Sequence, residues 1–336
     1  MSDTPDRYGP DDPWEMTRSA HPLQHGAVDA YAVTTLDGIT PLEAQLGVVT
    51  PQTVPDERMA EVLLGGAAQW LTYAILDGAK IDGLAERLET AELPHACLFA
   101  NSDDLGAVAP WLVQLDRDTP LVRQLFTAGE GPRALWGADA GVFLRSALPL
   151  ADLRAHLRRF TKVRADAEAA PVFFRFWEPR VMARYVQAHD PAARASLCAL
   201  LGTGAMIAVD RHNDRAVHVV ADSPAERPPR VWPRLHADLS PIRLEIFVED
   251  LADRIAVDIP PLADVARAER RETVTGLVQA ARGIALRLDK SVTRYVYAAL
   301  MIGGLPEADP RFADIVGSGR HELDRSRLML KLARDV

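Results

Sequence analysis

The sequence predicts an α/β fold, in which a mixed sheet is flanked by helices and is followed by a mainly helical C-terminal lobe. Short apolar segments of strand length alternate with amphipathic segments of helix length between about residues 62 and 222, and this alternation is typical of layered α/β domains. Beyond about residue 234 the strand-like segments give way to helical patterns. The connections are long enough for parallel crossovers, although antiparallel pairs remain open.

Six segments are predicted to be strands because they are short, apolar and bounded by turn residues. They are residues 70–79, 95–100, 111–116, 141–147, 204–210 and 215–221. The last two are close enough in the chain to form a hairpin around His212, Asn213 and Asp214, since these residue types favour turns.

The helices are predicted from apolar periodicity and from their start signals. Three begin at prolines that suit a first helical turn, which are Pro120, Pro149 and Pro179. The others are predicted over residues 81–93, roughly 262–288, 291–304, and from about 320 onward.

The chain divides into four parts on composition. Residues 1–61 are rich in Pro, Asp and Thr, and we expect a partly disordered N-terminal extension, which is disordered over about its first 25 residues and loosely ordered beyond them. Residues 62–222 form the α/β lobe, and residues 234–336 form the mainly helical lobe. Between them, residues 223–233 contain four prolines and are the best candidate for a linker.

Composition and charge exclude several classes of protein. Of the 336 residues, 48% are hydrophobic and 25% charged, as in ordinary globular proteins. The net charge of −9 argues against a general nucleic-acid binder. No apolar stretch is long enough to span a bilayer, and the N-terminus lacks the features of a secretory signal. We therefore expect a cytoplasmic protein that binds neither nucleic acid nor membrane, with Cys97 and Cys198 as buried thiols.

The stretch Phe173–Arg180, which reads FFRFWEPR, combines a strand signal with a helix start. Large apolar groups alternate onto both faces, which predicts a strand buried on both sides. The arginines are unexpected there, because a buried cation needs a partner. Two interpretations remain open. Arg175 or Arg180 forms ion pairs inside the protein, for example with Glu178 or a nearby Asp, or the two arginines hold an anion or a partner's carboxylate.

Catalytic motifs are not found in the sequence. It contains no G-x-S-x-G, P-loop, H-E-x-x-H or C-x-x-C pattern. His212 and His218 lie close in the sequence to Asp210 and Asp214, as the ligands of a metal site can, but a hairpin turn is the simpler explanation. No catalytic, cofactor-binding or metal-binding residue is therefore predicted. Arg145, inside an apolar strand segment, is a further cation expected to need a partner.

Six blocks in order carry a resemblance to a known family. They are LDGA (76–79), LFA (98–100), APWLVQL (109–115), WGADAGVFLRS (136–146), LRAHLRRFTKV (153–163) and FFRFWEPRVM (173–182). Over about residues 69–190 the chain resembles the domain-of-unknown-function 4123 family, the effector adaptors or chaperones of bacterial type VI secretion. The family's strongest motif is Phe-Arg-Phe-aromatic-acid-Pro-Arg, with Trp177 here in the usual tyrosine position and Glu178 in the usual aspartate position.

The resemblance implies a non-enzymatic function. Such proteins bind a secreted effector protein in the cytoplasm and help load it onto a VgrG-type spike protein, without any cofactor. It also implies that Arg175, Trp177, Glu178 and Arg180 are a partner-binding or structural motif. Two alternatives are a small α/β hydrolase or transferase acting on an anionic substrate, and an immunity protein that neutralises a toxin.

Overall fold

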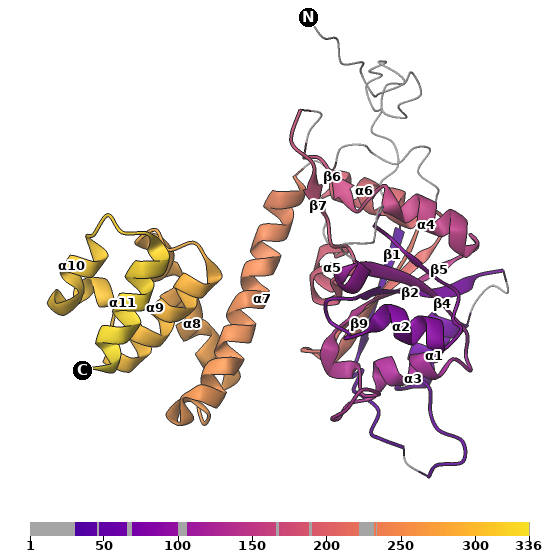
Figure 1. Cartoon of the computed structure of the whole chain (residues 1–336), viewed down its shortest axis with the longest axis horizontal. Helices are drawn as coiled ribbons and strands as arrows, with labels where there is room; N and C mark the ends of the chain where they lie inside the picture. The colour runs from indigo at the N-terminus through magenta and orange to yellow at the C-terminus, as the bar shows by residue number, and fades with distance from the viewer. Residues whose placement is uncertain are drawn as a thin grey trace, which may run out of the picture.

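The protein consists of an α/β lobe and a helical C-terminal lobe (Figure 1). A computed structural model describes residues 31–45, 47–65, 69–99, 106–165, 168–187, 190–221, 232 and 234–335. The predicted fold class is confirmed. Cys97 and Cys198 are both buried, as expected.

A seven-stranded sheet forms the centre of the α/β lobe, in the order β1-β9-β8-β5-β2-β4-β3. Its strands are β1 (Tyr31–Asp37), β2 (Leu71–Asp77), β3 (His95–Cys97), β4 (Pro110–Leu115), β5 (Gly141–Ser146), β8 (Ala205–Asp210) and β9 (Arg215–Ala221). Each pair of neighbours in this sheet is antiparallel, including the predicted β8–β9 hairpin. The long connections therefore carry helices across the sheet without making parallel pairs.

Helices cover both faces of the sheet. Because successive strand residues point to opposite faces, Tyr73 and Ile75 lie in one hydrophobic core while Ala74 and Leu76 lie in the other. The first core is covered by α4 (Leu150–Arg158), α5 (Pro179–Tyr185) and α6 (Pro191–Leu201). The second is covered by α1 (Glu57–Leu64), α2 (Leu84–Thr90) and α3 (Pro120–Phe126). Burial on both faces explains why the central strands read as continuous apolar runs.

Residues 31–61 belong to this lobe, so the predicted boundary at residue 62 is too late. Strand β1 pairs with β9 along its whole length, from Tyr31 opposite Ala221 to Asp37 opposite Arg215. Further along, four side chains are buried in the core under α1–α3, which are Ile39, Leu42, Val54 and Met59. The disorder predicted for the first 25 or so residues falls outside the described residues.

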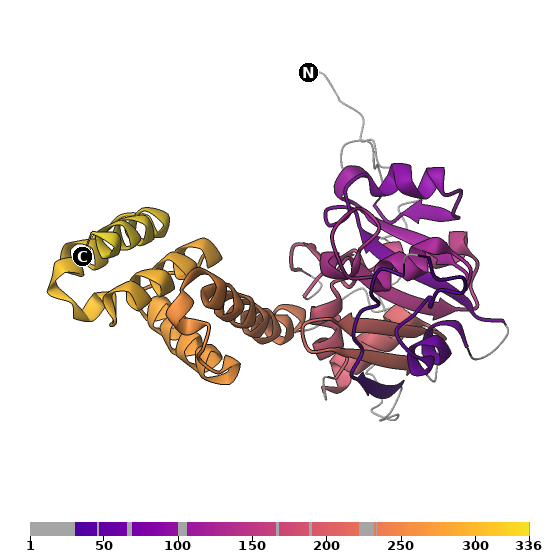
Figure 2. The ribbon, with the colours of Figure 1, turned by 90° about the horizontal axis from the view of Figure 1, so that it is seen from below.

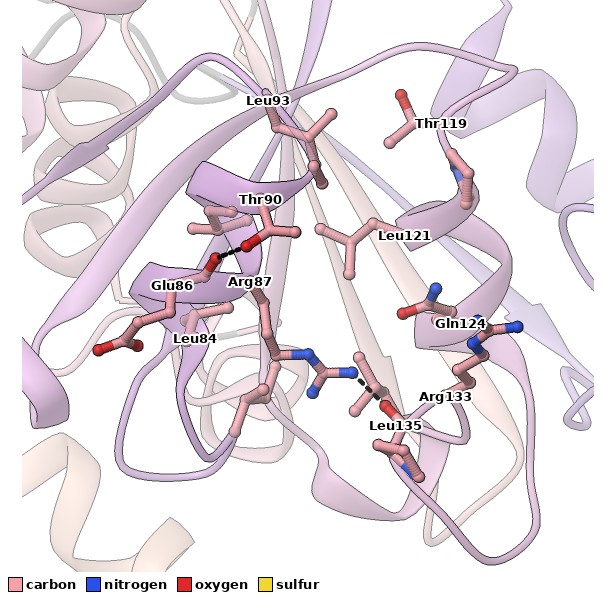
Figure 3. Close-up of a pocket in the computed structure, with 15 residues that line it drawn as sticks. Leu84, Glu86, Arg87, Thr90, Leu93, Thr119, Leu121, Gln124, Arg133 and Leu135 are labelled. Atoms are coloured by element: carbon pink, nitrogen blue, oxygen red, sulfur yellow. Dashed lines mark hydrogen bonds between the residues drawn. The ribbon is translucent and has the colours of Figure 1, made fainter.

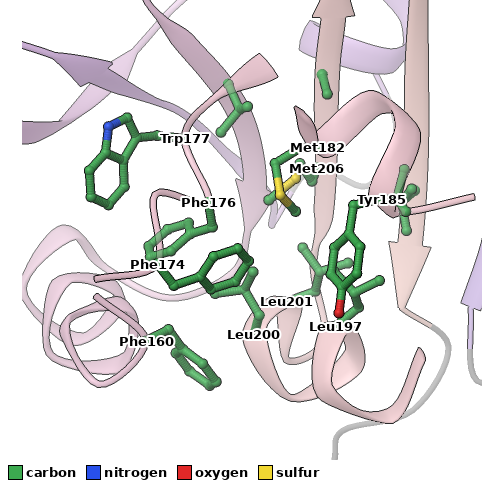
Figure 4. Close-up of a cluster of buried hydrophobic side chains, with 14 of the residues drawn as sticks. Phe160, Phe174, Phe176, Trp177, Met182, Tyr185, Leu197, Leu200, Leu201 and Met206 are labelled. Carbon is green, nitrogen blue, oxygen red and sulfur yellow. The ribbon is translucent and has the colours of Figure 1, made fainter. Parts of the chain in front are cut away.

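The strand predicted for FFRFWEPR is wrong, whereas the corner before the helix is confirmed. Within this stretch, strand pairing is limited to β7 (Val172–Phe173), which pairs with β6 (Lys162–Val163) in a two-stranded ribbon outside the main sheet. The chain then turns, and the Glu178 N–H donates to the Arg175 carbonyl over 3.1 Å. The buried aromatic rings that suggested a strand instead pack in a cluster beneath the helices (Figure 4).

The helical lobe begins with the long helix α7 (Leu235–Asp258), which was missed because the first helix of this lobe was expected at about residue 262. It continues with α8 (Arg267–Gly283), α9 (Asp289–Ile302), α10 (Ala313–Val316) and α11 (Glu322–Arg334). The two cores share α7, because Leu235 and Leu239 lie in the α/β core while Leu251 and Ile255 lie in the helical core. Figure 2 shows this helix running from one lobe into the other.

The predicted linker over residues 223–233 is described only at Trp232. This residue is fully buried, and its indole N–H donates to the Tyr185 hydroxyl over 2.7 Å. Its ring lies 4.7 Å from that of Phe174 between centroids. Trp232 is therefore part of the α/β core; the rest of the segment falls outside the described residues.

Candidate functional site

The carboxylate of Asp77 holds the corner in place. Asp77 ends β2 and is only 3% exposed. Its Oδ2 accepts from Arg175 Nη2 over 2.5 Å and from Trp177 Nε1 over 3.2 Å, and its Oδ1 accepts from the Ala79 N–H over 3.0 Å. These bonds satisfy a buried charge and tie LDGA to FFRFWEPR, two segments far apart in the chain.

Glu178 extends this arrangement towards the surface. Arg175 Nε lies 3.1 Å from a Glu178 carboxylate oxygen, and Arg243 of α7 lies 3.8 Å from the other. The side chain of Arg175 is 42% exposed, so the expectation that it is desolvated is wrong. The expected ion pairing with Glu178 is confirmed, and the structure adds Asp77 as the buried partner.

Arg180 points away from this cluster towards α7. With Arg184, one turn further along α5, it faces a row of acidic residues on α7. Arg180 lies 3.0 Å from Glu249 and 2.5 Å from Asp250. Arg184 lies 2.6 Å from Glu249 and 3.7 Å from Glu245. The first helix after the corner is therefore bound to the helix that both lobes share.

A second pair of arginines approaches the same acidic row from α8. Arg271 lies 3.2 Å from Glu249, and Arg267 lies 3.3 Å from Asp253. His212, in the β8–β9 turn, lies 3.5 Å from Asp253 and contacts the Arg267 guanidinium. We call this set the junction network; it comprises Arg180, Arg184, His212, Glu245, Glu249, Asp250, Asp253, Arg267 and Arg271.

The protonation states of the junction network follow from its geometry. Burial works against the charge of Glu249, but hydrogen bonds and charges from Arg184, Arg180 and Arg271 hold the pKa of its carboxyl below the ordinary value. Burial likewise opposes the charge of Arg180, yet Asp250 and Glu249 raise its pKa. Burial, with the neighbouring Arg180 and Arg267, lowers the pKa of His212. Near neutral pH the network is therefore a cluster of paired charges around Glu249.

A hollow of about 370 Å³ lies where the corner meets α7. Glu178 and Arg180 form part of one wall, and Arg243, Phe247 and Asp250 form part of the other. Its cations therefore face acids of the same chain. This balance favours the interpretation that the corner arginines form internal ion pairs over the interpretation that they hold an external anion.

Two further polar residues noted in the sequence, Arg145 and Asp210, are buried in the α/β lobe. Arg145 is 4% exposed, and among the described residues its guanidinium donates hydrogen bonds of 3.5 Å to the Val62 and Trp70 carbonyls. Asp210 is fully buried and accepts from the Asn213 amide over 2.8 Å, within the hairpin turn. In the part of the chain that the structure describes, no group of three His, Cys, Asp or Glu side chains is placed to hold a metal ion.

Sequence reasoning missed Asp77, Arg184 and Glu249. A signal for two of them exists, because side chains four apart share one face of a helix. Three rows have this spacing: Arg180 and Arg184, then Glu245, Glu249 and Asp253, then Arg267 and Arg271. The signal becomes readable only once α7 is recognised as a helix.

Comparison with known families identifies the segment that carries the corner. Residues 72–196 match the family model described as "Domain of unknown function (DUF4123)". This segment is therefore similar to the DUF4123 family. The DUF4123 segment runs from β2 into α6, so it includes Asp77, Arg175, Trp177, Glu178 and Arg180.

The helical lobe lies outside the DUF4123 match. No curated protein and no solved structure matches the chain. Among the described residues, no helix is long and apolar enough to cross a membrane.

Proposed function

We propose that this protein is a non-enzymatic adaptor, or chaperone, of bacterial type VI secretion. In the cytoplasm it binds a secreted effector and helps load that effector onto a VgrG-type spike protein. The observation that carries the proposal is the DUF4123 match, which covers the corner motif on which the resemblance to such adaptors rests.

The arrangement around the corner supports a binding role. Arg175 and Arg180 are paired with carboxylates of the same chain, so they fix the position of α5 and α7. An adaptor must hold cargo and also reach a second protein, and two lobes joined through one helix offer two surfaces. A specific interface of this kind buries on the order of 1,200 Å² or more.

The test is to co-express the full chain with the effector and spike proteins encoded beside it. We expect the effector to co-elute with this protein at fixed stoichiometry, and to become more soluble in its presence. An effector that is equally soluble alone and never co-elutes contradicts the proposal and reopens the hydrolase or transferase alternative.

Experiments with and without the spike protein distinguish an adaptor from an immunity protein. An adaptor brings effector and spike into one complex, so omission of this protein must lower the amount of effector that co-elutes with spike. An immunity protein suppresses the toxicity of the effector equally well when the spike is absent. Neutralisation without any effect on spike assembly therefore supports the immunity alternative.

A further inference from the structure

An apolar groove lies between α2 and α3, on the face of the sheet opposite the corner (Figure 3). Its volume is about 600 Å³, within the range that binding pockets of proteins occupy. The large aliphatic side chains that line it are Ile81, Leu84, Leu88, Leu93, Leu121 and Leu135. We call this hollow the α2–α3 groove.

The groove is a gap in the layer of helices. Its floor consists of leucines that are already buried, such as Leu84 and Leu88, whereas Leu93 and Leu121 at its rims are only half-buried. Figure 3 shows Leu121 reaching from α3 towards α2, and Arg87 reaching from α2 to the Pro132 carbonyl across one end. Side chains of this chain thus border the space without filling it.

Arginines outnumber acids in the lining of the groove, although the chain as a whole carries a net charge of −9. Arg87 and Arg133 line it together with a single acid, Glu86. A second hollow of about 430 Å³ shares Arg133 and adds Arg123. Within the described residues, neither Arg123 nor Arg133 forms an ion pair, so these charges are available to a partner.

We infer that the α2–α3 groove binds an amphipathic helix of a partner protein, with acidic residues beside its apolar stripe. A helix is the fitting occupant because the groove lies in a layer of helices over a sheet, where one more helix lays its apolar face between two others. Acidic flanking residues are complementary to Arg123 and Arg133. This inference rests on the proposed function, because it requires that the protein has a protein partner.

The test uses the full chain and two labelled synthetic helices of about 16 residues, each with an apolar i, i+3, i+4, i+7 stripe. One carries Glu beside the stripe, and the other carries Lys at the same positions. Fluorescence anisotropy measures the binding. We expect the Glu helix to bind more tightly, and its affinity to fall about tenfold in the double variant Arg123→Glu with Arg133→Glu.

The matched control reverses two exposed arginines of the helical lobe, Arg320→Glu with Arg327→Glu. It changes the net charge equally, and it leaves the α2–α3 groove intact because these residues lie beyond α7 (Figure 1). We expect this control to bind the Glu helix like the wild type. Leu121→Gln removes an apolar contact at the rim without changing the charge, and we expect it to weaken the binding of both synthetic helices.

Four results overturn the inference. The first is a dissociation constant above about 1 mM for the Glu helix. The second is an equal loss of affinity in the groove variant and the control variant. The third is a concentration-dependent dimer of the wild-type chain that the groove variant no longer forms. The third result assigns the groove to a second copy. A fourth result concerns co-elution: if the groove variant still co-elutes with effector and spike at wild-type levels, the proposed function stands while this inference fails.

Discussion

At the scale of single residues, Asp77 explains why the corner has its sequence. A carboxylate that is 3% exposed is costly unless donors surround it. Arg175, Trp177 and the Ala79 N–H supply those donors from two segments. The motif therefore forms one hydrogen-bonding unit, in which Trp177 and Arg175 donate to the same carboxylate oxygen of Asp77.

Arg175→Ala should lower the free energy of unfolding by about 1–3 kcal/mol, as for a lost hydrogen bond to a buried charge. The loss should stay below the roughly 3–5 kcal/mol of a fully buried ion pair, because Arg175 is half-exposed and Asp77 keeps two donors. Urea unfolding measures the change. The control combines Arg175→Ala with Asp77→Asn, where the effect of the first substitution should shrink. An unchanged unfolding free energy, together with lost partner binding, would instead make Arg175 a partner contact.

Glu249→Gln should destabilise the protein in a pH-dependent way. The folded-state pKa of Glu249 lies below its ordinary value of 4.5, so its charge adds stability above that pH, and this stability is lost as pH falls through the folded-state pKa. The difference in unfolding free energy between wild type and Glu249→Gln should therefore be constant near neutral pH and shrink below about pH 4.5.

Glu245→Gln is the control for this pH dependence. The side chain of Glu245 is exposed, and its only ion pair among the described residues is the 3.7 Å contact with Arg184. Its substitution should change stability little at any pH, since exposed pairs contribute about 0–1 kcal/mol. If Glu249→Gln gives a difference that does not vary with pH, the arginines around Glu249 do not favour its charge in the folded protein.

At the scale of elements, α7 has two roles along its length. Its first half completes the α/β core through Leu235 and Leu239, and its second half belongs to the helical core. A chain that ends after residue 233 should therefore unfold far more easily than one that ends after residue 250. The two leucines alone contribute about 3–6 kcal/mol by burial. Thermal melting of both shortened chains tests this, and equal melting temperatures would place the end of the α/β core before α7.

The elements that the sequence predicts well are those with a uniform environment. Strands β2, β5 and β8 are buried on both faces and read as apolar runs. Strand β1 was missed because it lies at the edge of the sheet with most of its described side chains exposed. Helix α7 was missed because its apolar stripe serves a different core in each half, and because it contains Pro241.

The same limit applies to the site. The corner residues Arg175, Trp177, Glu178 and Arg180 stand out in the sequence, because cations beside large aromatic groups demand an explanation. Their partners do not stand out. Asp77 ends β2 and Glu249 lies on α7, so only the tertiary fold brings them near the corner arginines. The direction in which strands pair also depends on the tertiary fold. Long connections allow both parallel and antiparallel pairs, so the sequence did not predict that all pairs in the main sheet are antiparallel.

At the scale of the whole molecule, α7 and the junction network couple the two lobes. The helix enters both cores, and arginines from the α/β lobe and from α8 converge on the same acidic row. Separation of the lobes would therefore expose apolar surface and leave buried charges unpaired. We expect wild-type protein to unfold in a single cooperative thermal transition.

Glu245→Pro should split this transition into two. Residue 245 lies between the part of α7 in the α/β core and the part in the helical core, and a proline inside a helix costs about 3 kcal/mol or more because it removes a backbone hydrogen bond and clashes with the preceding turn. Glu245→Ala is the matched control, since it removes the same exposed carboxylate while alanine favours the helix. Differential scanning calorimetry should show two transitions for the proline variant and one for the alanine variant. A single transition at lower temperature in Glu245→Pro would mean that side-chain contacts between the lobes, such as the ion pair of Arg180 with Glu249, keep the lobes cooperative without a continuous α7.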